Sequence, residues 1–133
     1  MVHLADINYW AVLAATVMTM VLGFLWYSPV LFAKPWMKEI GLKAENMSGG
    51  GAATYVLTAL TAIIGTWVLA ALLTLTDGTV GSGVCVGLLV GVAITVKIGM
   101  NYLFEGRSLK LFLITVSYHL VTFVLAGLIL GAM

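Results

Sequence analysis

Two ionisable side chains, Lys97 and His119, occur inside long apolar stretches of the sequence. Ionisable groups at depth in a membrane are rare and often mark ion, proton or substrate paths. The ammonium group would favour an anionic or polar solute, and the imidazole can titrate near neutral pH. Two simpler interpretations stay open, because Lys97 can extend its stem back to the membrane surface and His119 can form a packing hydrogen bond.

Helical geometry places further polar residues beside these two groups. At 100° per residue Asn101 falls on the same side of its helix as Lys97, and Thr115 and Thr122 fall on the same side as His119. Side chains tilt toward the N-terminus of their own helix, so two adjacent antiparallel helices bring Lys97 and His119 to similar depths. We therefore predict a polar cavity lined by these five residues.

Other chemistry is poorly represented in the sequence. No acid lies inside an apolar stretch, His3 and Asp6 are too few ligands for a metal site, and Ser117 faces a different direction from His119. The net charge is +1 and Cys85 is the only cysteine. We expect neither enzyme activity, nor a metal or cofactor, nor a nucleic-acid partner.

The composition indicates which elements must position the polar residues. Hydrophobic residues make up 62% of the 133-residue chain and charged residues 8%, with a mean hydropathy of +1.15. A membrane-spanning helix needs about 20 mostly apolar residues. The sequence predicts an all-α bundle of four transmembrane helices in a single membrane domain, residues 1–133. The expected helices cover 8–28, 53–75, 79–103 and 109–131.

The connectors between these helices predict the orientation. Lys34, Lys38 and Lys43 follow the first helix, and Arg107 and Lys110 follow the third. Because basic connectors favour the cytoplasmic side, both termini are expected outside.

The longest connector, 29–51, is expected to contain a short interfacial helix on the cytoplasmic membrane surface. Trp36, Lys38 and Lys43 would contact membrane lipids there. A basic loop in solvent is the alternative for this connector.

Small residues recur every four positions in two of the predicted helices. One such ladder consists of Gly83, Gly87, Gly91, Thr95 and Gly99. A second ladder consists of Ala11, Ala15, Thr19 and Gly23. Small residues let helix backbones approach closely in lipid. We predict that both ladders are contact faces, within the chain or between copies.

Three segments carry a resemblance to a known family. They are INYWAVLAA, GFLWYSPVLFAKPWMKEIGL and NYLFEGRSLKLFLITVSYHLV. The most specific pattern is WYSP-LF-K-W, from Trp26 to Trp36, followed by NYLFEGR. Through them the chain resembles the DUF1761 family of small bacterial membrane proteins of unknown function. The resemblance covers almost the whole chain. It implies a four-helix protein of the bacterial inner membrane but no activity.

Two functions remain as hypotheses. In the first, a small homo-oligomeric transporter or channel uses the polar cavity near Lys97 and His119. In the second, a structural or accessory subunit docks through its small-residue ladders on a larger membrane complex or on another copy. Lipid binding by the interfacial segment is a third and weaker possibility.

Overall fold

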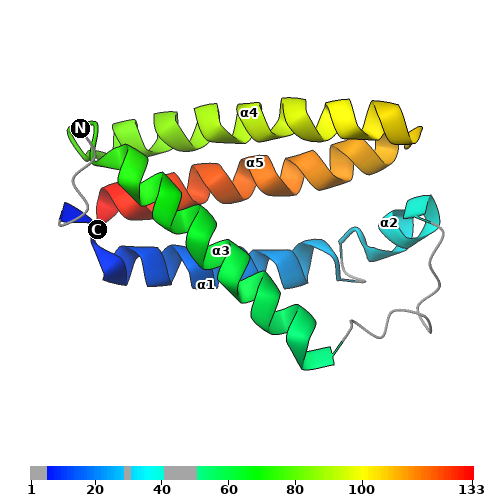
Figure 1. Ribbon diagram of the computed structural model, residues 1–133, viewed down its shortest axis with the longest axis horizontal. Helices are drawn as coiled ribbons and strands as arrows, with labels where there is room; N and C mark the ends of the chain where they lie inside the picture. Colours follow the sequence, from blue (N-terminus) through cyan, green and yellow to red (C-terminus); the bar gives the residue numbers. More distant parts are fainter. Residues whose placement is uncertain (1–5, 29–30, 41–50) are drawn as a thin grey trace.

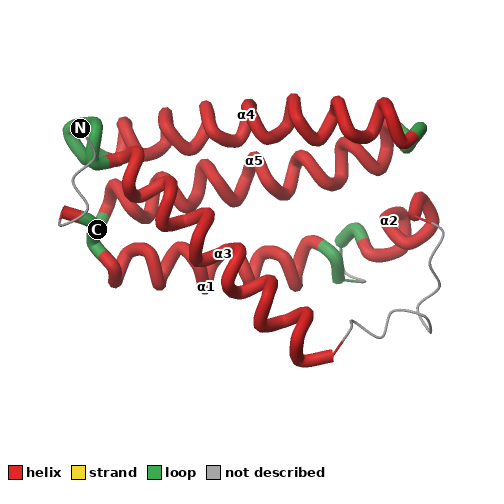
Figure 2. The backbone as a smooth tube through the Cα atoms, in the orientation of Figure 1, coloured by secondary structure: helices red, strands yellow, loops and turns green. Residues whose placement is uncertain are grey.

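Five helices make up the computed structural model, which describes residues 6–28, 31–40 and 51–133. They are α1 (Tyr9–Trp26), α2 (Ala33–Ile40), α3 (Gly51–Leu73), α4 (Val80–Glu105) and α5 (Leu109–Ala132). No strand occurs in these described ranges. α1, α4 and α5 run side by side, and α3 crosses in front of α1 at an angle (Figures 1 and 2). The prediction of an all-helical fold is confirmed.

Four helices are long and apolar enough to cross a membrane, namely α1, α3, α4 and α5. Their ends lie within two residues of the predicted boundaries. The chain therefore has the helices of a multi-pass membrane protein. The predicted short helix is present as α2, although its location on the membrane surface stays a prediction. Lys43, which was expected to contact lipid beside it, lies outside the described residues.

Side chains and turns define the helix ends. The side chains of Asn8, Thr79 and Ser108 accept hydrogen bonds from backbone N–H groups in the first turns of α1, α4 and α5, which satisfies donors that have no partner within the helix. Gly106 ends α4 with a φ of 69°. This left-handed conformation suits glycine and reverses the chain into α5 within a few residues.

The closest approach of two backbones among the described residues joins α4 to α5. Gly83, Gly87 and Gly91 are buried. A Cβ at Gly83 would overlap the carbonyl of Gly127, and one at Gly87 would overlap the carbonyl of Phe123. The α4 ladder thus lies against α5 of the same chain, with its backbone in direct contact.

The second ladder also packs within the chain. Ala11 and Ala15 of α1 are completely buried, and they belong to a hydrophobic core that includes Leu69 of α3 and Ala126 of α5. Thr16 and Thr66 share a buried hydrogen bond of 2.8 Å between α1 and α3. This core occupies the end of the bundle where both termini lie (Figure 1).

The N-terminal half of α3 leaves this core. Tyr55, Leu57, Leu60 and Ile64 of α3 are all exposed, and Figure 1 shows this half diverging from α4 and α5. The divergence opens the bundle on one face.

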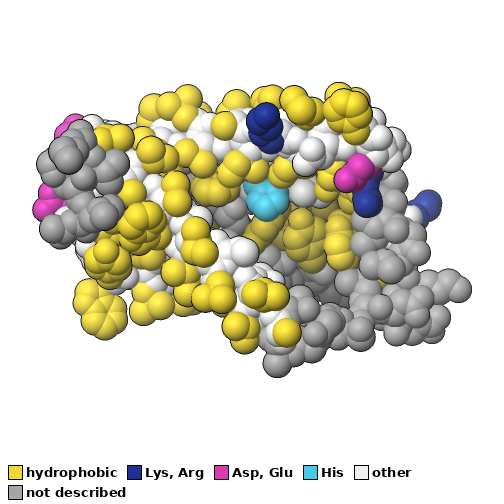
Figure 3. Space-filling model, viewed as in Figure 1, with side chains coloured by type: hydrophobic (Ala, Val, Ile, Leu, Met, Phe, Trp, Pro, Cys, Tyr) yellow, Lys and Arg dark blue, Asp and Glu magenta, His cyan; other side chains and the backbone are white. Residues whose placement is uncertain are grey.

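The basic residues of the two connectors lie at the same end of the bundle. Lys34 in α2 and Arg107 in the α4–α5 turn lie at this end, whereas Asp77 in the α3–α4 turn lies at the opposite end. Figure 3 shows acidic side chains at both ends, and basic ones at the end of the α4–α5 turn and over the middle of α4. The basic connectors therefore share one end, as the predicted orientation requires.

A methyl group at Gly87 tests the α4–α5 contact. Gly87→Ala should lower the free energy of unfolding by about 1–3 kcal/mol, because the methyl group would force the two backbones apart. Gly65→Ala in α3 is the matched control, since nothing lies within 4 Å of its added Cβ. Unfolding in a detergent titration measures both variants. Equal losses in both would contradict the contact.

Asp77 gives the α3–α4 turn a pH dependence. Its carboxylate accepts hydrogen bonds from the Ser82 hydroxyl at 2.6 Å and from the N–H and hydroxyl of Thr79. These bonds hold the pKa of Asp77 below its ordinary value of 3.8, the Ser82 bond most of all.

A carboxyl group whose pKa is lowered in the folded state stabilises the fold above its unfolded pKa, and loses that contribution as the pH falls. The melting temperature should therefore drop as the pH falls below 3.8, and it should drop less in Asp77→Asn. Melting curves of the two proteins across this range check the prediction. The same decline in both would contradict it.

Candidate functional site

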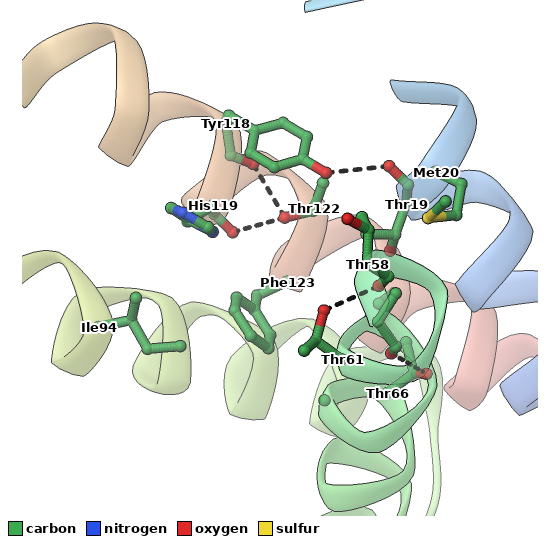
Figure 4. Close-up of a pocket in the computed structure, with 13 residues that line it drawn as sticks. Thr19, Met20, Thr58, Thr61, Thr66, Ile94, Tyr118, His119, Thr122 and Phe123 are labelled. Atoms are coloured by element: carbon green, nitrogen blue, oxygen red, sulfur yellow. Dashed lines mark hydrogen bonds between the residues drawn. The ribbon is translucent and has the colours of Figure 1, made fainter. Parts of the chain in front are cut away.

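A groove opens where α3 diverges from the bundle, and we call it the His119 groove. Its volume is about 340 Å³. Side chains from α1, α3, α4 and α5 line it (Figure 4). The lining residues are Thr19, Met20, Thr58, Thr61, Ala62, Gly65, Thr66, Ile94, Tyr118, His119, Thr122, Phe123 and Ala126. Threonine is the commonest residue type among them, so the groove carries several hydroxyl groups.

The hydroxyls of Thr19, Thr61 and Thr122 donate to carbonyl oxygens of their own helices. Thr122 Oγ1 lies 2.9 Å from the carbonyl oxygens of both Tyr118 and His119. Thr19 Oγ1 bonds to the Ala15 carbonyl, and Thr61 Oγ1 to that of Thr58. A hydroxyl that donates its single proton keeps its oxygen lone pairs as acceptors. The groove therefore presents acceptor oxygens and methyl groups to an occupant.

His119 supplies the one imidazole among the described residues. The side chain is half-buried and forms no hydrogen bond or ion pair with them. It lies in the eleventh position of α5, about 15 Å from the start of that helix at 1.5 Å per residue. A neutral imidazole offers one donor and one acceptor. His119 can thus bind and exchange a proton with water or a solute in the groove.

Tyr118, the neighbour of His119, fixes the position of α5 against α1. Its hydroxyl donates to the carbonyl oxygen of Thr19 at 3.0 Å. A Cβ at Gly23 would lie 2.9 Å from that hydroxyl, so the glycine makes room for it. Figure 4 shows the Tyr118 hydroxyl directed at α1, while the His119 ring turns toward the side of Ile94.

A cluster of aromatic side chains extends from Tyr118 to α2. The centroid of the Tyr118 ring lies 5.6 Å from that of Tyr27 and 6.3 Å from that of Trp26. Trp26 contacts Phe32 and Tyr27 contacts Trp36, each pair at 5.0 Å. The indole N–H of Trp26 also donates to the Ile114 carbonyl oxygen at 3.0 Å.

The sequence interpretation missed this cluster. The rings of Trp26, Tyr27 and Trp36 connect α1 and α2 to α5, and none of these contacts was predicted. The available signal was the WYSP-LF-K-W pattern itself, in which four aromatic residues occur within eleven positions.

Of the five residues predicted to line a polar cavity, the structure brings His119 and Thr122 together in the groove. Thr115 instead receives a hydrogen bond from the Tyr102 hydroxyl at 3.2 Å. Lys97 and Asn101 are exposed on α4 outside the groove.

Lys97 does not face the groove as the predicted cavity requires. Lys97 forms no hydrogen bond or ion pair with the described residues. The reason is that the glycine face of α4 packs on α5, which turns the opposite face outward. Lys97 still lies one helical turn from Ile94, a residue of the groove wall. Figure 3 shows basic and histidine side chains on this same face, over α4 and α5.

Metal-binding groups do not gather in the described parts of the chain. No three side chains of the types His, Cys, Asp and Glu lie close enough there to hold an ion. The groove offers hydroxyl oxygens and one imidazole instead.

Comparison with known proteins gives one match. The model of the family described as "Protein of unknown function (DUF1761)" matches residues 10–131. No curated protein and no solved structure matches the chain.

A double-mutant cycle tests how Tyr118 holds α1 against α5. Tyr118→Phe should cost about 1 kcal/mol of stability through the lost bond to Thr19. Gly23→Ala should destabilise the protein by displacing the Tyr118 hydroxyl, and should cost less when residue 118 is already phenylalanine. Free energies of unfolding of the four proteins give the coupling. Strictly additive losses would contradict the contact.

Proposed function

Because the chain belongs to the DUF1761 family of proteins of unknown function, we propose a function from its own site. The protein is a small homo-oligomeric transporter or channel whose polar path runs along the His119 groove. The observation that carries the proposal is an imidazole without a hydrogen-bond partner among the described residues, beside acceptor hydroxyls, near the middle of a helix long and apolar enough to span a membrane.

The cost of polar groups in hydrocarbon supports this function. An imidazole that faces lipid tails loses the hydrogen bonds it makes in water, and nothing among the described residues replaces them. Water or a polar solute in the groove would restore these bonds. An open groove that carries an imidazole and hydroxyl groups at this depth is therefore better suited to a hydrated path than to contact with lipid.

The groove also suggests an assembly. One copy leaves it open on the side where α3 diverges, and Lys97 is exposed on the neighbouring face of α4. A charged group facing lipid at this depth is costly. A second copy against this face would enclose the groove and bring Lys97 near the path.

We place the protein in the bacterial inner membrane with both termini outside. Support comes from the basic residues Lys34, Lys38, Arg107 and Lys110, which belong to the two connectors at one end. In this orientation α2 lies at the cytoplasmic surface. Its exposed Lys38 would meet lipid headgroups there, while Trp36 packs on Tyr27.

The alternative function is that of an accessory subunit, and the surface proposed for its docking is covered within the same chain. Gly83, Gly87 and Gly91 are covered by α5 of the same chain, and Ala11 and Ala15 are buried in the core. A docking role would need another surface, and no observation favours one.

Flux through proteoliposomes tests the proposed function. Stopped-flow light scattering would follow vesicles challenged with glycerol, urea, sodium acetate or sodium nitrate. We expect wild type to speed entry of at least one of these solutes. His119→Ala and Thr122→Val should each change that rate severalfold, because both residues line the groove.

Ser117→Ala is the matched control in α5. Its hydroxyl bonds to the Leu113 carbonyl oxygen and does not line the groove, so the rate should not change. Wild-type vesicles that match empty vesicles for all four solutes would contradict the proposal, as would equal rates in all variants.

A further inference from the structure

A second groove lies at the turn between α4 and α5, away from the proposed path. We call it the turn groove, and its volume is about 250 Å³. Gly99, Tyr102 and Leu103 of α4 face Leu109 and Phe112 of α5 across it, and Arg107 lies at its end. The walls are thus apolar, while the end carries a permanent positive charge.

The side chains around Arg107 indicate the level of this turn in the membrane. Leu103 is 86% exposed, Phe104 is 88% exposed and Leu109 is 71% exposed. Three large apolar side chains would not project from a turn surrounded by water alone. With the guanidinium among them, the turn fits the boundary where hydrocarbon meets the headgroups.

The guanidinium of Arg107 is held in place at this boundary. Its Nε donates to Glu105 at 2.8 Å, which uses one of five donors. Its Cζ lies 5.9 Å from the centroid of the Tyr102 ring, within the range of a cation–π contact. Lys110, three residues further on, is exposed and adds a positive charge that Glu105 does not balance. The turn therefore attracts an anion.

Gly99 lets the ring of Phe112 pack closely on α4. A Cβ at this position would lie 3.1 Å from that ring. The ring thereby forms part of the apolar lining of the turn groove. A hydrocarbon chain can lie in the groove beside it.

We propose that the turn groove binds an anionic phospholipid. The phosphate accepts hydrogen bonds from the Arg107 guanidinium, and an acyl chain lies in the groove along the Phe112 ring and Leu103. Guanidinium and phosphate form strong charge-assisted hydrogen bonds, and the walls match the chain in polarity. This site is separate from the His119 groove and does not depend on the proposed transport.

Lipid retention tests the proposal. The purified protein in mild detergent would be mixed with equal amounts of dioleoyl phosphatidylglycerol and dioleoyl phosphatidylcholine. Native mass spectrometry would then measure the lipid that each protein retains. Wild type should prefer phosphatidylglycerol, and Arg107→Gln should weaken that binding about tenfold, as the loss of a charge-assisted hydrogen bond implies.

Lys34→Gln is the matched control, because it removes one exposed positive charge from the same end of the bundle. It should retain phosphatidylglycerol as wild type does. Melting temperatures would verify that both variants are folded. Equal weakening in the two variants would overturn the proposal, since attraction to overall charge would then explain the binding.

Glycerol phosphate, which has the headgroup chemistry without a tail, tests separately whether the acyl chain contributes to binding. A large excess of this compound should not displace the bound lipid. Displacement as effective as that by dioleoyl phosphatidylglycerol would overturn the lipid proposal in favour of a site for free phosphate compounds.

Discussion

The direct backbone contact between α4 and α5 determines the arrangement of the other helices. Two glycine-lined helix faces approach so closely that a single added methyl group at Gly83 or Gly87 would overlap a carbonyl. In lipid, where apolar surfaces gain little from leaving the solvent, such close packing is a main source of helix association. The contact fixes the rotation of both helices about their axes. It thereby decides that Lys97 faces outward and that His119 faces the groove.

The remaining helices join this pair unevenly. α1 and the C-terminal half of α3 pack with α5 around Ala11, Ala15 and Leu69 near the termini. Toward the other end, Tyr118 and the aromatic cluster hold α1 and α2 on α5. α3 has few such contacts in its N-terminal half, so it diverges. The groove therefore forms because α3 packs densely with α1 and α5 at one end of the bundle only. At the other end α1 and α2 make their contacts with α5, and α3 diverges.

Much of this fold could be predicted from the sequence, because the thickness of a bilayer sets the length of an apolar helix and a four-residue period reveals a packing face. The helix ends and both ladders follow from these two rules. At 100° per residue Lys97 falls nearly opposite the glycine ladder of α4, and the structure exposes it while the glycines are buried. The angular positions of residues on one helix do not reveal which other helix packs against each of its faces.

That limitation explains which site residues were found. His119 and Thr122 were recognised from polarity in an apolar helix. Thr58, Thr61 and Thr66 were missed, although three threonines within nine residues of an apolar helix were a signal. The bond from Tyr118 to Thr19 joins residues 99 positions apart. No local pattern predicts such a pairing, and it depends on how α1 crosses α5.

The central claim is that polar solutes reach His119 near the middle of the membrane, and thiol labelling tests it most directly. His119→Cys, in a Cys85→Ser background, would be treated in proteoliposomes with a charged methanethiosulfonate reagent. Val96→Cys is the control, because Val96 is exposed on α4 outside the groove and at a similar distance from the α4–α5 turn. The account predicts labelling at position 119 and little at position 96. Equal protection of both positions would contradict it.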